Sequence, residues 1–181
     1  MKEVFEEYPI ISDGNILLQK VTIDDLDFIN KFKNSEEVYK YVPTFVPETQ
    51  NNTEFFIENI CDELFDNKIE IILGIYYKKE FCGLFEIYHY DKDKNQVTIG
   101  FRINKDFWNK GISSKSISLV IDYLFNKTNI KTICASTMVI NKSSERCLEK
   151  NNFLKYKEHI LEDWGYDKMV LVNKWILNKE D

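Results

Sequence analysis

The chain has 181 residues, the length of one ordinary domain, and 44% of them are hydrophobic, which is enough to bury a core. Its 24 basic and 30 acidic side chains give a net charge of −6. This balance argues against a nucleic-acid-binding protein, because such proteins usually carry a basic patch that neutralises phosphates. We therefore expect a single domain over residues 1–181 and no nucleic-acid partner, while a cationic partner would suit the charge.

The N-terminus and the cysteines bear on where the protein works. Met1–Glu7 is acidic where a secretory signal peptide needs positive charge followed by an apolar stretch, and no apolar run approaches the roughly 18 residues of a membrane span. Cys61, Cys82, Cys134 and Cys147 are scattered without a C-x-x-C pair, and there are only two histidines. We expect no metal site, no membrane association, and free thiols in a reducing cytoplasm.

The first third of the chain predicts one strand followed by helices. The expected elements are a strand at Ile16–Val21, a helix from Thr22 to about Lys33, a short helical turn capped by Ser35, and a helix at about Thr53–Phe65. The first helix opens with Thr22-Ile23-Asp24-Asp25, which resembles a capping box with Asp in place of Glu. The apolar stripes of the two helices are Leu26, Ile29 and Phe32, and then Phe56, Ile60 and Leu64.

In the middle of the chain, the spacing of the hydrophobic residues changes from a helical pattern to one typical of β-strands. Ile69–Tyr77, Phe81–Tyr90 and Gln96–Ile103 are separated by polar turns and predict a three-stranded antiparallel meander. The remaining expected elements are a buried helix at about Ile112–Asn126, a strand at Lys131–Thr137, a helix at Ser143–Asn151, a strand at Leu154–Ile160, a turn around Asp163-Trp164-Gly165 and a strand at Asp167–Ile176. This order predicts an α/β domain with a mixed sheet.

The segment Phe101–Ser114 carries the clearest chemical signal, because a strand runs into a loop that opens a helix at Gly111. The first turn of a helix has four N–H groups without an intrahelical partner and the positive end of the helix dipole. Such an end binds phosphate when nothing bulky blocks the backbone, and Gly111, Ser113 and Ser114 are small. Taken alone, the segment also fits an ordinary loop glycine followed by a serine cap.

A second segment, Asn141–Phe153, follows thirty residues after Gly111. By itself it fits an Asn or Ser cap before a surface helix. Together with the first segment, it resembles the GNAT-type N-acetyltransferase superfamily, in particular the branch named after the ribosomal-protein N-terminal acetyltransferases RimJ and RimL. The resemblance covers nearly the whole chain.

Three motifs in the same order carry this resemblance. The branch typically shows an iGY/F strand, then F/Y-W-G-K-G-Y/I-A-T, then N-x-x-S-x-x-v-x-E-K-x-G-F. This chain has Ile99-Gly100-Phe101, then Phe107-Trp108-Asn109-Lys110-Gly111-Ile112-Ser113-Ser114, then Asn141-x-x-Ser144 leading to Glu149-Lys150-Asn151-Asn152-Phe153. The implied fold is a GNAT-type mixed, mostly antiparallel sheet of about seven strands, flanked by helices on both faces.

Four residues depart from the pattern. Asn109 replaces a common Gly and Ser113 a common Ala or Gly, and both are small enough for backbone contacts. Asn152 replaces the usual Gly before Phe153, and Asn is the best non-Gly residue for the left-handed conformation needed after a helix end. Leu148 stands seven residues after Asn141, where some members carry a tyrosine general acid. A tyrosine acid at that position is therefore absent.

The resemblance implies transfer of an acetyl group from acetyl-CoA directly to a primary amine in a ternary complex. Backbone groups of Phe101, Arg102 and Ile103 would pair with the pantetheine arm, and an N–H there would polarise the thioester carbonyl. The other implied cofactor contacts are Trp108, the N–H groups of Asn109, Lys110, Gly111, Ile112, Ser113 and Ser114 to the pyrophosphate, Asn141 to the pantetheine arm, and Ser144 near the sulfur.

An amine must lose a proton before it attacks, so the reaction calls for a general base. Glu86 alternates with Phe85 and Ile87, and a buried carboxylate there would have the raised pKa that a base near neutrality needs. A solvent-facing strand Glu is the alternative. Glu162 and Asp163, in the turn before the last strand, are further candidate bases and could equally be ordinary turn acids.

Several alternatives stay open on the sequence alone. The acceptor could be a protein N-terminus, a polyamine or other small amine, or an aminoglycoside-type antibiotic. An acidic tract of Glu48, Glu54, Glu58, Asp62, Glu63 and Asp66 could attract a cation or could be a solvated helix face. The protein could also be a non-catalytic acyl-CoA-binding module or an interaction protein with a degenerate site, and either a monomer or a homodimer.

Overall fold

The computed structural model describes residues 2–33, 35–41 and 52–180. Met1 and Glu48, both named above, lie outside this description, as does the side chain of Phe32. In the described residues, one eight-stranded sheet has the order β1-β2-β3-β4-β5-β6-β8-β7. Its strands are β1 Ile11–Ser12, β2 Ile16–Lys20, β3 Glu70–Tyr77, β4 Glu80–Asp91, β5 Gln96–Ile103, β6 Thr132–Met138, β7 Leu154–Glu162 and β8 Val170–Asn178.

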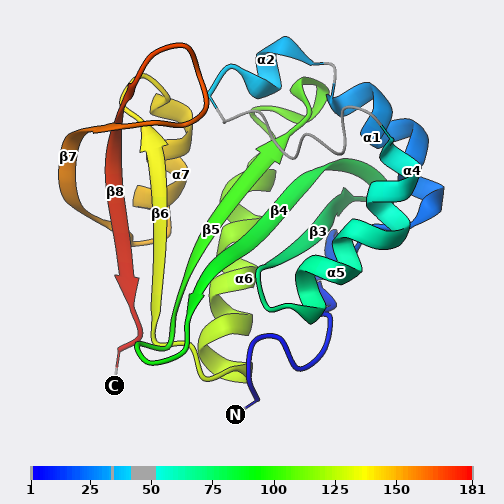
Figure 1. The fold of residues 1–181 in the computed structure, drawn as a ribbon, viewed down its shortest axis with the longest axis horizontal. Coiled ribbons are helices and arrows are strands. Elements are labelled where there is room, and N and C mark those ends of the chain that lie inside the picture. Colours follow the sequence, from blue (N-terminus) through cyan, green and yellow to red (C-terminus); the bar gives the residue numbers. More distant parts are fainter. Residues whose placement is uncertain (1, 34, 42–51, 181) are drawn as a thin grey trace.

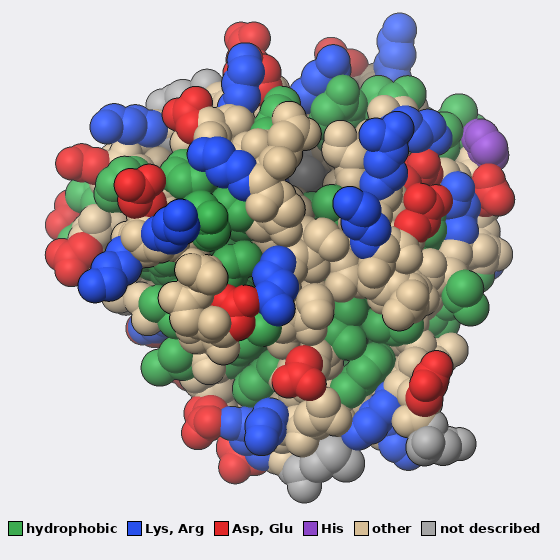
Figure 2. Space-filling view, turned by 180° about the vertical axis from the view of Figure 1, so that it is seen from behind, with side chains coloured by type: hydrophobic (Ala, Val, Ile, Leu, Met, Phe, Trp, Pro, Cys, Tyr) green, Lys and Arg blue, Asp and Glu red, His purple; other side chains and the backbone are tan. Residues whose placement is uncertain are grey.

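Helices cover both faces of the sheet (Figure 1). They are α1 Leu26–Lys33, α2 Glu36–Tyr39, α4 Thr53–Phe55, α5 Cys61–Asp66, α6 Ile112–Lys127 and α7 Lys142–Lys150. Helices α6 and α7 pack on one face, and α1, α4 and α5 pack on the other. On the side seen in Figure 2, acidic and basic side chains are interspersed, and no basic patch gathers there.

Alternating strand residues build the two cores. In β3, Ile71 and Leu73 face the core under α6, while Ile72 faces the core under α1 and α4, and all three are fully buried. Burying a side chain of this size stabilises the fold by roughly 1.5–3 kcal/mol. This alternation, with period 2, also decides which β3, β4 and β5 side chains reach the site described below.

Strands β5 and β6 separate from each other partway along their length, as Figure 1 shows. They are parallel and pair only from Gln96–Thr132 to Thr98–Cys134. β5 continues to Ile103 and β6 to Met138, while β6 stays paired with β8 on its other side. We call this opening the β5/β6 gap. Backbone groups there are free to pair with something other than the sheet.

Most predicted elements are present, and the differences have local causes. The meander of β3, β4 and β5 is confirmed. β1 was not predicted, because its two residues are too few to show a period. The helix predicted at Thr53–Phe65 contains a π-helical stretch, Phe56–Ile60, so the buried residues are Phe56, Ile57 and Cys61 rather than a strict four-residue stripe. The last strand begins later than predicted, at Val170.

Two predicted helix ends are confirmed in atomic detail. The carboxylate of Asp25 accepts the N–H of Thr22 at 2.8 Å, although the first turn, Ile23–Asp25, is 3-10 rather than α. Asn152 has a φ of 62°, the left-handed conformation. The N–H of Phe153 donates to the Leu148 carbonyl at 3.1 Å, which closes a Schellman motif after α7. In the described part of the chain, no helix is long and apolar enough to cross a membrane.

Candidate active site

The β5 edge presents alternate backbone groups to the β5/β6 gap. The Asn104 N–H donates to the Cys82 carbonyl of β4 at 2.8 Å. Because the pattern of an antiparallel ladder alternates, the N–H and C=O groups of Phe101 and Ile103 point away from β4, toward the gap. The backbone of Arg102 belongs to the ladder with β4. Of the three residues predicted to pair with a pantetheine arm, two therefore offer backbone groups in the right direction.

The loop before α6 forms a cradle of N–H groups. Asn109 and Gly111 have φ values of 61° and 75°, and Gly111 is the N-cap of α6. The first intrahelical bond runs from the Lys115 N–H to the Gly111 carbonyl at 3.1 Å, so the N–H groups of residues 112–114 precede it. A Cβ added at Gly111 would meet nothing within 4 Å. The space in front of the loop is open, and its N–H groups could hold a pyrophosphate.

Two side chains fix this loop in place. The Trp108 indole N–H donates to the Ile103 carbonyl at 2.8 Å, which ties the loop back to the end of β5. The Asn151 amide donates to the Ser114 carbonyl at 3.0 Å and to the Cys147 carbonyl at 2.8 Å. Asn151 thereby links the last turn of α7 to the first turn of α6. The sequence placed Asn151 in a motif but gave no sign of this contact.

Replacing Gly111 with Val should weaken acetyl-CoA binding at least tenfold, about 1.4 kcal/mol. The Val side chain would project into the open space where an anion would meet the N–H groups. The backbone φ at position 111 is also one that L residues rarely adopt. Gly14→Val is the matched control, because Gly14 also has a positive φ, 93°, and open space around it. Calorimetric titration with equal affinity for the two variants would remove the phosphate-loop assignment.

Asn141 and Ser144 form the N-terminus of α7. The Asn141 side chain caps the helix by accepting the Ser144 N–H at 3.2 Å, and its amide donates to the Ser144 hydroxyl at 3.2 Å. Asn141 therefore acts as the N-cap of α7, as the alternative interpretation of this segment predicted. An amide group has two N–H donors, so one remains for a ligand.

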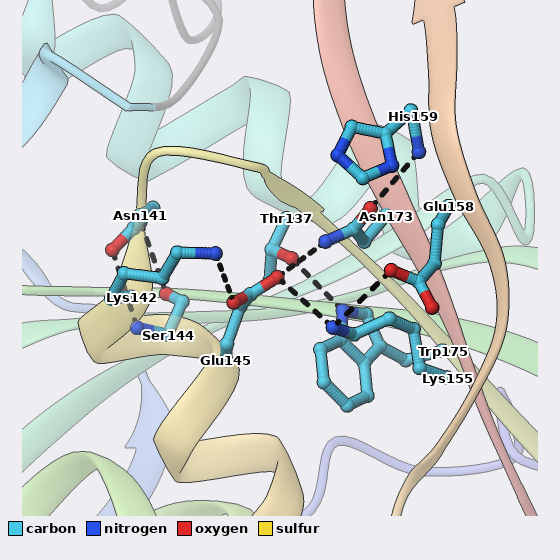
Figure 3. Close-up of polar contacts among 10 residues, drawn as sticks. All are labelled: Thr137, Asn141, Lys142, Ser144, Glu145, Lys155, Glu158, His159, Asn173 and Trp175. Atoms are coloured by element: carbon cyan, nitrogen blue, oxygen red, sulfur yellow. Dashed lines mark hydrogen bonds and ion pairs between the residues drawn. The ribbon is translucent and has the colours of Figure 1, made fainter.

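A polar network anchors this helix end to β7 and β8 (Figure 3). Glu145 is 5% exposed and accepts hydrogen bonds from Lys142, at 2.8 Å, and from the Asn173 amide of β8. Burial alone would raise the pKa of Glu145, but these hydrogen bonds and nearby Lys155 outweigh it, so the pKa lies below its ordinary value. The network fixes the position of Ser144. The sequence did not single out Glu145 or Asn173.

A cavity of about 280 Å³ connects the β5/β6 gap with a group of acidic and aromatic side chains. Its lining residues are Tyr41, Glu70, Glu86, Tyr88, Ile99, Gly100, Phe101, Arg102, Ala135, Ser136, Thr137, Asn141, Ser144, Leu148 and Trp164. β3, β4 and β5 contribute neighbouring side chains from one face of the sheet, β6 and α7 contribute residues from across the β5/β6 gap, and Tyr41 after α2 and Trp164 in the β7–β8 turn complete the lining. Leu148, at the position where some family members carry a tyrosine general acid, lines the cavity and is buried.

Glu86 lies in this cavity as an ion pair with Arg102. Glu86 is 7% exposed, so the solvent-facing alternative is wrong, and its side chain lies on the face opposite Phe85 and Ile87, as predicted. The Arg102 guanidinium contacts the Glu86 carboxylate, and the Arg102 side chain is 3% exposed. Burial lowers the pKa of Arg102 to about 10, which leaves it a cation at neutral pH.

Glu162 and Asp163 lie beside the cavity rather than in its wall. The Glu162 carboxylate accepts from Lys174 at 2.6 Å and from the Trp164 indole at 2.9 Å, which orients Trp164. Burial alone would raise the pKa of Glu162, but these two hydrogen bonds hold it below its ordinary value. Asp163 is exposed and accepts the Gly165 N–H at 2.9 Å. Of the three adjacent residues, Trp164 alone lines the cavity.

Glu70 is a cavity carboxylate that the sequence analysis missed. It is the first residue of β3, partly buried and paired in register with Tyr88 of β4. Burial raises the pKa of Glu70 to about 7, although nearby Arg102 lowers it in part. The sequence did contain a signal for its burial, because Glu70 alternates with Ile71 and shares a strand face with Ile72. A carboxylate at a strand end, however, usually faces solvent.

The acidic tract is a solvated helix face as far as the structure describes it. Glu54, Glu58, Glu63 and Asp66 are exposed, and Asp62 forms an ion pair with Lys20. Within the described ranges, no three His, Cys, Asp or Glu side chains are grouped closely enough to hold a metal ion. Two acids, Glu70 and Glu86, line the same cavity as residues of the β5/β6 gap.

Comparisons with known proteins agree with this geometry. The acetyltransferase (GNAT) domain family matches residues 15–154. The uncharacterized N-acetyltransferase p20 of Bacillus licheniformis is 25% identical over 167 residues, which are 90% of this chain and 91% of that protein.

Solved structures share the fold at low identity. RimL, a ribosomal-protein alpha-N acetyltransferase solved in complex with coenzyme A, superposes with a TM-score of 0.81 at 14% identity, over 94% of this chain and 98% of that one. Spermidine N-acetyltransferase from Vibrio cholerae, solved with CoA and spermine, has a TM-score of 0.76 at 17% identity, over 92% of this chain and 96% of that one.

Proposed function

Because the chain belongs to the GNAT acetyltransferase family and is an acetyl-CoA-dependent acyltransferase, we propose that it acetylates a primary amine by direct attack in a ternary complex. The observation that carries this proposal is the single cavity that runs from the β5/β6 gap to the buried carboxylates. A direct attack needs both substrates in one place, and the carboxylates line the same cavity as Ser144 and Phe101.

The cofactor side of the site is made largely of backbone groups. We assign the pantetheine arm to the N–H and C=O groups of Phe101, the N–H of Ile103 and the free donor of Asn141, because the Ile103 carbonyl already accepts from Trp108. Arg102 contributes its side chain to the cavity wall. The pyrophosphate is assigned to Trp108 and the N–H groups of residues 109–114. When bound, acetyl-CoA supplies the acetyl group and a thiol leaving group.

The rest of the chemistry needs few groups. An N–H of Phe101 or Ile103 would hold the oxyanion that develops on the thioester carbonyl. The Ser144 hydroxyl, held by Asn141 at 3.2 Å, would donate to the departing sulfur. A thiolate leaves readily, so no strong acid is required.

The acceptor side of the cavity suits a cation. Tyr41, Tyr88 and Trp164 line it together with two carboxylates, and aromatic faces and carboxylates both attract ammonium groups. A protein N-terminus, a polyamine and an aminoglycoside-type amine share this chemistry. RimL and the spermidine enzyme are named for the first two of these acceptors.

The test is a panel of peptides with free N-termini, spermidine, spermine and an aminoglycoside, each incubated with acetyl-CoA and analysed by product mass. We expect one class to gain an acetyl group at the amine. A thiol-release assay would be confounded by the four free cysteines. Acetyl-CoA binding without an acetylated product from any amine would contradict the proposal and favour the binding-module alternative.

We also propose that residues 1–181 act as one acetyltransferase domain, because strands from Ile11 to Asn178 join one sheet. The four cysteines are free thiols, which fits the reducing cytoplasm expected from the sequence. The proposed site lies within a single copy of the chain, and a monomer or a homodimer could both use it.

Replacing Ser144 with Ala should lower kcat and leave acetyl-CoA affinity nearly unchanged, because a hydrogen bond to the departing sulfur strengthens only in the transition state. Ser143→Ala is the matched control, since Ser143 is its exposed neighbour on the same helix. Steady-state kinetics and titration of acetyl-CoA measure the two effects. Weaker binding at unchanged kcat would make Ser144 a binding residue instead.

A further inference from the structure

We propose that Glu70 is the general base that takes the proton from the acceptor's ammonium group. This inference rests on the proposed function and identifies one residue of the same site. The candidate bases predicted from the sequence were Glu86, Glu162 and Asp163, so this assignment differs from that prediction.

Glu70 lies on the correct face and in the correct cavity. β3 pairs Glu70 with Tyr88, and β4 pairs Glu86 with Gly100, so Glu70, Glu86 and Arg102 share one side of the sheet. Glu70 and Ser144 both line the same cavity. An amine that enters between Tyr88 and Trp164 can therefore contact Glu70 while it faces the β5/β6 gap.

Glu86 and Glu162 are each already paired with a cation. Glu86 is held by Arg102, and Glu162 by Lys174. A carboxylate stabilised in its charged form by an adjacent cation is a weak proton acceptor. Glu70 makes no hydrogen bond or ion pair to any residue that the structure describes, which leaves both of its oxygens for the acceptor.

The groups around Glu70 are neutral or paired with an opposite charge, so we expect Glu70 to change its charge near neutral pH. It is faced by Tyr88 and Glu86 from β4, Arg102 from β5, Cys61 from α5, and Tyr8. Burial raises the pKa of Tyr88 and that of Cys61 to about 12, and it raises the pKa of Tyr8 as well, so all three stay neutral. Asp62, on α5 beside Cys61, pairs with Lys20. The charge of Arg102 is balanced by Glu86.

The proton balance is complete without another reactant. The ammonium gives one proton to the Glu70 carboxylate, and the freed nitrogen lone pair forms the C–N bond to the acetyl carbon. The C–S bond breaks with its electron pair going to sulfur, and the thiolate takes the second proton lost by nitrogen. Glu70 then returns its proton to solvent.

The test is the pH profile of kcat/KM with the best acceptor from the amine panel. In the wild type, we expect kcat/KM to rise with pH through about 7, because the base must be deprotonated. Glu70→Gln should abolish that rise and lower the plateau roughly 100-fold or more, and Glu70→Asp should restore part of both. Unchanged acetyl-CoA affinity would show that the Gln variant is folded.

Three further variants make the result decisive. Glu162→Gln should keep the rise at its wild-type position, and Glu80→Gln, at an exposed strand end, is the matched control. Glu86→Gln should keep the rise but move it to lower pH, because Arg102 without its partner would lower the pKa of Glu70 further. A rise that survives Glu70→Gln, or that disappears only in Glu86→Gln or Glu162→Gln, would overturn the assignment. Failure of the proposed function is seen separately, as a wild-type enzyme that acetylates no amine, and it would overturn this inference as well.

Discussion

Replacing Arg102 with Met should lower the free energy of unfolding by about 3–5 kcal/mol at neutral pH. The Arg102 side chain is 3% exposed and contacts Glu86, which is itself buried. Without the guanidinium, the Glu86 carboxylate would remain in the interior as a charge with no compensating cation. The guanidinium also lies over the Tyr39 ring, 5.8 Å from its centroid, and that contact would be lost too.

Two further variants separate the buried charge from the loss of packing. The double variant Arg102→Met with Glu86→Gln should recover most of the lost stability, because a neutral amide has no uncompensated charge. Arg146→Met, which changes the other arginine of the chain at an exposed position on α7, should change stability by no more than about 0.5 kcal/mol. Urea unfolding of all four proteins measures this. A double variant no more stable than Arg102→Met alone would contradict the ion-pair explanation.

The sequence was sufficient for features that depend on local chemistry. The αL residue Asn152 could be predicted because few residues tolerate that conformation, and the loop around Gly111 because small residues stand directly before a helix. The face of Glu86 followed from period 2 alone. The order of the motifs along the chain then indicated that the loop and α7 belong to one known fold.

Contacts between distant residues could not be predicted in the same way. Period 2 gives the face of Glu86 but not its partner, which is 16 residues away and became visible only through the register of β4 and β5. Asn173 meets Glu145 across 28 residues, and Asn151 meets Ser114 across 37. Glu70 was missed because its burial depends on elements packed against β3, such as α5, rather than on its own strand. The candidate base is therefore the part of the site that depends most on tertiary structure.

Glu70→Gln should make the protein more stable than the wild type above pH 7, by up to about 3 kcal/mol, and this difference should disappear toward pH 4. The pKa of Glu70 is raised from 4.5 to about 7 in the folded protein, mainly by burial. The folded state therefore holds the Glu70 proton between these pH values while the unfolded chain releases it. The stability contributed by this proton is complete below about pH 4.5 and is lost as the pH rises through about 7.

Gln cannot lose a proton, so the variant avoids the penalty of a buried charge at high pH. The measurement is the difference in unfolding free energy between Glu70→Gln and the wild type at several pH values from 4 to 8.5, in which the titration of all other carboxyls cancels. Glu80→Gln, at an exposed strand end, should give a difference near zero throughout. A Glu70→Gln difference independent of pH would mean that the folded protein does not hold this proton. Glu70 would then lack the property that suits it to deprotonate an ammonium group near neutral pH.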